Sequence, residues 1–190
     1  MKLYQLTIAL EGIKPTIWRR ILVSENLNFH YLHHVIQIVM GWQNYHLWEF
    51  KKGEFRIGYP ELLEDSLVQD DQEVCVKHFL KKEGDEILYE YDFGDCWLHK
   101  ISVEKIFETT KFKPYPVLEA GERACPPEDC GGIGGYEELV AAMKDKDHPE
   151  REEFIEWLGG PFEPEKFTGM YSINQALKGL REYANRWNRG

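Results

Sequence analysis

Residues 86–107, EILYEYDFGDCWLHKISVEKIF, restrict the fold of this chain more than any other segment. Large or apolar side chains alternate with polar ones on both sides of the turn-forming Asp92-Phe93-Gly94-Asp95. This period of two on each side of a turn predicts an antiparallel hairpin with one buried face. The side chains assigned to that face are Ile87, Tyr89, Tyr91, Trp97, His99, Ile101 and Val103.

Other stretches carry their own periodicity. Alternation predicts strands at 3–10 and 16–23, and a hairpin at 46–58 that turns at Lys52-Gly53, with His46, Trp48 and Phe50 on one face. Helical spacing predicts a helix over 29–40 ended by Gly41 and a short helix ended by Gly84. Further helices are expected at 136–145, 150–158 and 173–187, the last with a Ser172–Gln175 capping box.

Strands therefore come early in the chain and helices late, which is typical of the α+β class. We expect a mainly antiparallel sheet of about five to six strands with helices packed on it and a helical C-terminal part. Residues 60–73 hold six acids and no base, and are expected to be a solvated loop. The segment 109–135 lacks periodicity and is expected to join the sheet to the late helices within a single domain, 1–190.

Composition narrows the classes of function. The 190 residues are 43% hydrophobic, enough for the core of one domain, and no apolar run approaches the length of a membrane helix. Lys and Arg number 23 against 33 Asp and Glu, and a net charge of −10 argues against DNA binding. Four cysteines do not make a disulfide framework, so we expect a cytoplasmic chain with free thiols and no membrane contact.

The stretch ACPPEDCGGIGGYEELV, residues 124–140, looks most like chemistry. Cys125 and Cys130 are spaced at the edge of zinc-knuckle patterns, and a site there would need His99 or other ligands from elsewhere in the fold. The glycines lack the lysine and hydroxyl of a phosphate-binding loop. We therefore predict no cofactor, with zinc or another divalent cation as the alternative.

Four carboxylates could converge with His99 as an acid–base pair or around a hard cation. They are Asp92, Asp95, Glu128 and Asp129. The opposing interpretation is architectural, because short acids in turns cap their own backbone and a histidine in an apolar row is usually part of the core.

Three histidines also gather at 30, 33 and 34. His30 and His34 share a helix face, but no acid flanks them as a metalloprotease motif would require.

Five motifs, in this order, resemble the Ri-plasmid ORF-three-like family. They are KPTIWRRI, Met40-Gly41-Trp42, HLWEF, YEYDFGDCWLHKISVE and ACPPEDCGGIGGY. Many members carry insertion-element passenger or TnpR-type labels. The resemblance implies a single α+β domain found on plasmids and mobile elements, without an established activity. Leu118 stands where a Cys is frequent in the family, which weakens a three-cysteine metal site.

The resolvase label does not fit the residues. A serine recombinase needs an activated serine among arginines and a DNA-binding helix pair, whereas serines here are few and the second helical region is acidic. Two hypotheses follow. The first is an accessory or binding module whose protein or small-molecule partner engages the 109–135 segment and the 92–95 corner. The alternative is a metal-assisted hydrolase or nuclease that uses this corner, His99 and the CPPED stretch.

Overall fold

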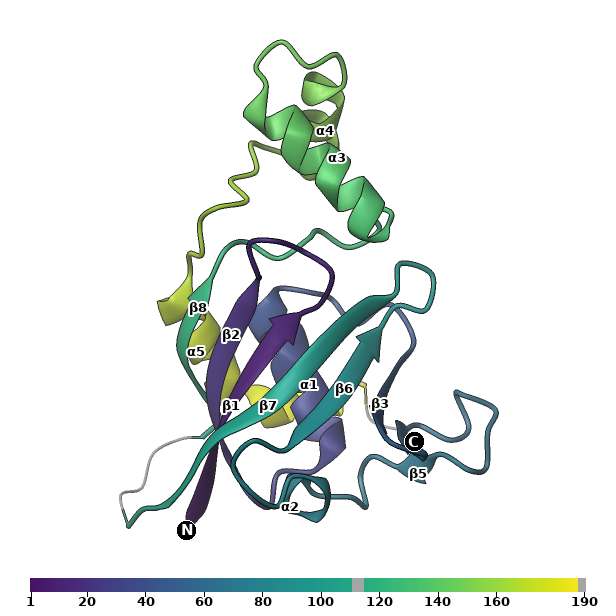
Figure 1. Cartoon of the computed structure of the whole chain (residues 1–190), viewed down its shortest axis with the longest axis vertical. Helices are drawn as coiled ribbons and strands as arrows, with labels where there is room; N and C mark the ends of the chain where they lie inside the picture. The colour runs from purple at the N-terminus through teal and green to yellow at the C-terminus, as the bar shows by residue number, and fades with distance from the viewer. Residues whose placement is uncertain (111–114, 188–190) are drawn as a thin grey trace.

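The computed structural model describes residues 1–110 and 115–187, which form an α+β fold built on one mixed sheet (Figure 1). The strand order across the sheet is β5-β4-β3-β6-β7-β1-β2-β8. The strands are β1 (Lys2–Leu10), β2 (Trp18–Ser24), β3 (Trp48–Lys52), β4 (Phe55–Gly58), β5 (Gln69–Asp70), β6 (Glu86–Tyr91), β7 (Trp97–Glu108) and β8 (Val117–Glu122).

The prediction of five to six strands was too low, and the sheet is not wholly antiparallel. β5 pairs with β4 in parallel through only two residue pairs, Ile57↔Gln69 and Gly58↔Asp70. It lies within the acidic stretch 60–73, where no alternation marks it. β8 lies within the 109–135 segment and pairs with β2, and residues 111–114 of that segment lie outside the described residues.

The predicted hairpin forms the middle of the sheet. Its register pairs Ile87 with Ile101, Tyr89 with His99 and Tyr91 with Trp97, and all six side chains are buried. A buried face of this kind is stabilised mainly by the apolar area that it removes from water, at about 25 cal/mol per Å². On its other side β7 pairs with β1, so the hairpin continues into β1 and β2.

One long helix covers a face of the sheet. α1 (Phe29–Met40) lies behind the sheet in Figure 1 and has the predicted bounds. Asn28 Oδ1 caps its start by accepting the amide of Tyr31, and Gly41 ends it in the left-handed conformation, at φ 88°. Ten of its twelve residues are buried, because α5 and α6 pack on the side that the sheet leaves open.

The later helices differ in part from expectation. The short helix α2 (Val76–Phe79) ends before Gly84. α3 (Gly132–Lys144) begins one turn earlier than predicted, and α4 (Arg151–Leu158) forms as expected; the two lie together beyond the end of the sheet (Figure 1). The predicted last helix is divided at Gly179 into α5 (Met170–Lys178) and α6 (Leu180–Asn185). No described helix has the length and apolar character needed to cross a bilayer.

The capping box predicted at Ser172 does not form. α5 begins at Met170, so Ser172 lies inside its first turn, where its hydroxyl donates to the carbonyl of Gly169. Farther along the same helix, Asn174 meets the edge strand β8. Its Oδ1 accepts the amide of Leu118 and its Nδ2 donates to the carbonyl of Leu118, both at 2.9 Å.

Candidate functional site

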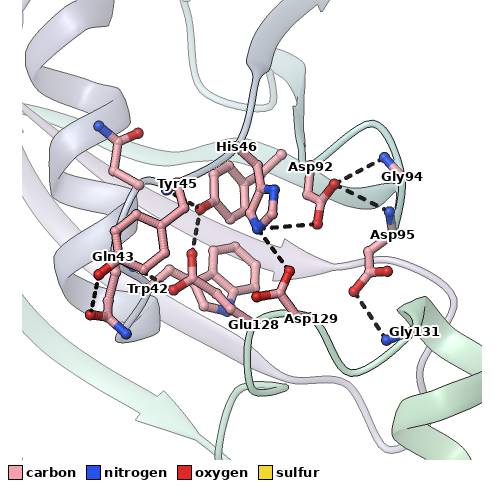
Figure 2. Close-up of polar contacts among 12 residues, drawn as sticks. Trp42, Gln43, Tyr45, His46, Asp92, Gly94, Asp95, Glu128, Asp129 and Gly131 are labelled. Atoms are coloured by element: carbon pink, nitrogen blue, oxygen red, sulfur yellow. Dashed lines mark hydrogen bonds and ion pairs between the residues drawn. The ribbon is translucent and has the colours of Figure 1, made fainter.

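Three segments meet at one end of the sheet (Figure 2). We call them the post-helix loop (residues 41–47), the corner (92–95) and the CPPED loop (124–131). Trp42 Nε1 donates to the carbonyl of Pro126 at 2.9 Å, and the amide of Gln43 donates to Glu128 Oε2 at 2.9 Å. These bonds hold the CPPED loop against the post-helix loop although more than 80 residues separate them.

His46, Asp92 and Asp129 converge at the centre of this region. His46 Nε2 lies 3.0 Å from Asp129 Oδ1 and 3.7 Å from Asp92 Oδ2. Within residues 1–110 and 115–187, this is the only group of three or more ligand-type side chains close enough to hold one ion. Nε2 is shielded from solvent and, despite the 3.0 Å contact, has no partner in hydrogen-bond geometry in the described part of the chain.

The corner fixes the direction of Asp92. Asp92 is 8% exposed and sits at φ 58°, a left-handed conformation that aspartate tolerates better than most residues. Its Oδ1 accepts the amides of Gly94, at 2.9 Å, and Asp95, at 3.4 Å. Oδ2 is thereby turned toward His46 (Figure 2). Asp92 therefore has two roles: Oδ1 caps the turn, and Oδ2 faces the candidate site.

Glu128 is used in holding the loops together. One oxygen accepts the amide of Gln43 and the other accepts the hydroxyl of Tyr91, which itself accepts the amide of Tyr45 at 3.1 Å. Burial, and then the Glu128 carboxylate, raise the pKa of Tyr91 well above its ordinary value. Tyr91 therefore remains a protonated donor across the physiological range, and Glu128 is not free to bind an ion.

Asp95 is also structural. Its Oδ2 accepts the amide of Gly131 at 3.2 Å, just before α3. The glycines that follow are required by close packing, because a Cβ on Gly132 would lie 2.8 Å from the carbonyl oxygen of Asp95 and one on Gly135 only 1.7 Å from that of Cys130. The GGIGG sequence thus lets the helix approach the corner.

His99 does not join the carboxylates. It is fully buried between β6 and β1, with Nδ1 2.9 Å from the carbonyl oxygen of Trp97. Burial lowers the pKa of its imidazole to about 4, so it is neutral at pH 7. In this position it belongs to the core, packed edge-to-face with Trp42.

The two cysteines of the CPPED loop do not form a metal knuckle in the described residues. Cys125 Sγ lies 3.0 Å from Arg19 Nη2 and 3.0 Å from the sulfur of Met40. Burial raises the pKa of Cys125 to about 11 and that of Cys130 to about 12. Both are therefore neutral thiols at pH 7, whereas metal ligation uses the thiolate.

Sequence reasoning missed His46 and Arg19. The alternation at 46–58 placed His46 in a strand, but β3 begins at Trp48 and His46 lies in the post-helix loop. Arg19 is 2% exposed and donates to the carbonyls of Val39 and Glu122, which anchors the start of the CPPED loop. His46 is identified as a site residue only by its proximity in space to Asp92 and Asp129. No local sequence pattern indicates that proximity.

Comparison with known proteins agrees with the motifs. Residues 2–170 match the model of a family described as "Plasmid pRiA4b ORF-3-like protein". The chain is 32% identical over 186 residues to "Uncharacterized protein y4hQ" of Sinorhizobium fredii, an alignment covering 97% of this chain and 94% of that protein. The crystal structure of the protein of unknown function MM3350 from Methanosarcina mazei Go1 has a TM-score of 0.77 and 41% identity, over 88% of this chain and 95% of that one. None of these descriptions states an activity.

Proposed function

We propose that this chain, which belongs to the plasmid pRiA4b ORF-3-like family, is a binding module that takes a divalent cation at His46, Asp92 and Asp129. The observation that carries the proposal is the convergence of one imidazole nitrogen and two carboxylate oxygens within 4.8 Å of one another. Zn–N and Zn–O distances of about 2.0–2.2 Å place the ligand atoms of one ion roughly 3 to 4 Å apart. The separations of 3.0 and 3.7 Å from His46 Nε2 fit this range.

The ligand set indicates the class of ion. Imidazole suits Zn²⁺ and other first-row ions, and carboxylates alone would suit Mg²⁺ or Ca²⁺. One nitrogen with two carboxylate oxygens therefore favours Zn²⁺, Mn²⁺ or Fe²⁺ over Mg²⁺ and Ca²⁺. Two negative charges beside one imidazole also give the site the sign that a cation requires.

The surroundings leave access from outside. The Asp129 side chain is 66% exposed, whereas that of Asp92 is 11% exposed, so the site is anchored on the corner and open on the CPPED side. A surface depression of about 360 Å³ adjoins Asp129 and is lined also by Tyr45 and Trp157. It offers room for water or for a group of the partner to complete the coordination shell.

We do not propose hydrolysis as the function. The alternative used His99 together with the corner and the CPPED stretch, but His99 is buried in the sheet and lies outside the converging group. Glu128 and Asp95 are held by backbone amides. A cation-dependent binding module needs only the three ligands and the open side next to Asp129.

Thermal unfolding with added MnCl2, ZnCl2, MgCl2 or CaCl2 tests the proposal. An ion at 100 times its dissociation constant stabilises the folded state by about 2.7 kcal/mol, so Mn²⁺ or Zn²⁺ should raise Tm saturably. His46→Gln and Asp129→Asn should abolish the rise with Mn²⁺, and Asp147→Asn, which changes an exposed acid outside the site, should keep it. An equal rise with Mn²⁺ in wild type and Asp129→Asn, or no rise with any of the four ions, would reject the proposal.

A further inference from the structure

A second group of histidines lies on α1, beside a cavity that also reaches His46 of the cation site. His30, His33 and His34 line a cavity of about 300 Å³, which Leu62 and Trp187 also line. All three imidazoles are buried, and their ring nitrogens are bonded very differently.

His33 has both nitrogens satisfied. Nδ1 lies 2.8 Å from the hydroxyl of Tyr89, and Nε2 lies 2.7 Å from Asn44 Oδ1. The ring also stacks on Trp48 at a centroid distance of 3.9 Å. His33 is therefore a core residue that ties α1 to β6 and to the post-helix loop.

His30 is bonded through one nitrogen only. Nδ1 lies 3.2 Å from Oδ2 of Asp71, whose side chain is fully buried. A carboxylate on Nδ1 selects the tautomer with the proton there and leaves the lone pair on Nε2. That Nε2 is shielded from solvent and has no hydrogen-bond partner in the described ranges. A carboxylate behind one ring nitrogen is the arrangement that orients metal-binding histidines.

His34 lies one helical turn further along, on the same face. Its ring centroid is 4.6 Å from that of His30, and neither of its ring nitrogens has a hydrogen-bond partner among the residues described. Burial, and then His30, lower the pKa of His34 to about 3. The imidazole is therefore neutral at pH 7 and does not have to lose a proton to bind a metal.

We propose that His30 and His34 form a two-nitrogen site for a borderline divalent ion such as Zn²⁺, Ni²⁺ or Cu²⁺, with Asp71 positioning His30. A metal–nitrogen distance of about 2 Å sets the ring centres of two imidazoles on one ion roughly 5 Å apart, close to the separation found here. The cavity supplies the remaining coordination positions. This nitrogen-only site differs in ligand chemistry from the mixed site, although His46 lines the same cavity.

The first test uses Asp129→Asn, so that binding at the other site does not interfere. In this background we expect one equivalent of Cu²⁺ with nitrogen hyperfine couplings in its electron paramagnetic resonance spectrum. Adding His34→Gln or His30→Gln should weaken Cu²⁺ binding at least tenfold, and adding Asp71→Asn should weaken it less. Adding His148→Gln, a partly exposed histidine outside both sites, should change nothing.

A second measurement needs no variant in the helix. In wild-type protein, Zn²⁺ should move the imidazole ¹⁵N resonances of His30 and His34 and leave those of His33 unchanged. Binding of Cu²⁺ that His34→Gln does not weaken, or ¹⁵N resonances of His30 and His34 that do not move, would overturn the proposal. A cavity that holds water alone gives this last result. Loss of Mn²⁺ binding in His46→Gln tests the cation site alone and has no bearing on the proposed site at His30 and His34.

Discussion

Asp92 and His46 face each other across the candidate cation site, with Oδ2 of the carboxylate 3.7 Å from Nε2 of the imidazole. Because Oδ1 of the same carboxylate caps the corner, the two roles of Asp92 can be separated by substitution. Asp92→Asn keeps an acceptor for the amides and should cost less than about 1 kcal/mol in stability, yet it should abolish the rise in Tm with Mn²⁺.

Asp92→Ala removes both roles. It should also lose about 1–2 kcal/mol in urea unfolding, because the amides of Gly94 and Asp95 lose their acceptor. If the Asn variant binds Mn²⁺ as wild type does, Asp92 is not a ligand.

The glycines of α3 provide a second prediction. Gly135→Ala should destabilise the protein by about 3 kcal/mol, because the new Cβ would lie 1.7 Å from the carbonyl oxygen of Cys130. Gly134→Ala is the matched control in the same helix, since its Cβ meets nothing within 4 Å, and it should stabilise by about 0.5–1 kcal/mol. Urea midpoints of the two variants check this, and equal midpoints would contradict the close approach of the helix to the CPPED loop.

Arg19 and Arg20 are neighbours with unequal expected effects. Arg19 is buried, donates to three backbone carbonyls and lies over the ring of Phe167. Arg19→Lys should therefore cost about 2–3 kcal/mol, because an ammonium group cannot reproduce the planar fork. Arg20→Lys changes a partly exposed ion pair with Glu104 and a cation–π contact with Trp18, and should cost less than about 1 kcal/mol. Equal losses in guanidinium unfolding would show that Arg19 does not anchor the CPPED loop.

Thiol reactivity should follow burial. At pH 8 a thiol with a pKa of about 11, such as Cys125, is ionised in about one molecule in a thousand, and Cys130 in fewer. Iodoacetamide should therefore modify exposed Cys96 first, as peptide mass spectrometry can follow. All four cysteines should react in 6 M guanidinium, on the order of the concentration that unfolds stable domains. Modification of Cys125 as fast as Cys96 in the folded protein would contradict its partly buried position and raised pKa.

Stability should fall on acidification because of His99. Its pKa is depressed to about 4 in the folded protein, so the unfolded chain binds the extra proton as the pH drops below about 6.5. The stability that His99 contributes is complete above pH 6.5 and is lost progressively down to pH 4, by about 3 kcal/mol. His99→Gln should reduce, but not remove, the dependence of the urea midpoint on pH, because His34 also has a depressed pKa, whereas His148→Gln should leave it parallel to wild type. A parallel curve for His99→Gln would contradict this prediction.

The sequence could predict the elements whose signal is local. The alternation around the 92–95 corner and the helical spacing of 29–40 both gave the structure found, because one face of each is buried along its whole length. β5 was missed because it is defined only by its two residue pairs with β4, and its sequence has no alternating pattern. The apolar stripe of 173–187 continued past Gly179, so the division between α5 and α6 was also missed.

The candidate site could be predicted only in part. Asp92 and Asp129 lie in turn-rich motifs that already suggested chemistry, and both reach His46. His46 itself was assigned to a strand, because its approach to the aspartates depends on how the post-helix loop folds back after Gly41. The position of His99 in an apolar row predicted that it could be a core histidine, and it is buried, because alternation with a period of two marks a buried face.

The side-chain amide of Asn174 forms hydrogen bonds to both backbone groups of Leu118, as a neighbouring strand would. β8 ends the sheet, and an unpaired edge of this kind is where a second sheet would add and begin aggregation. By occupying both the donor and the acceptor of Leu118, α5 blocks edge-to-edge association at that residue.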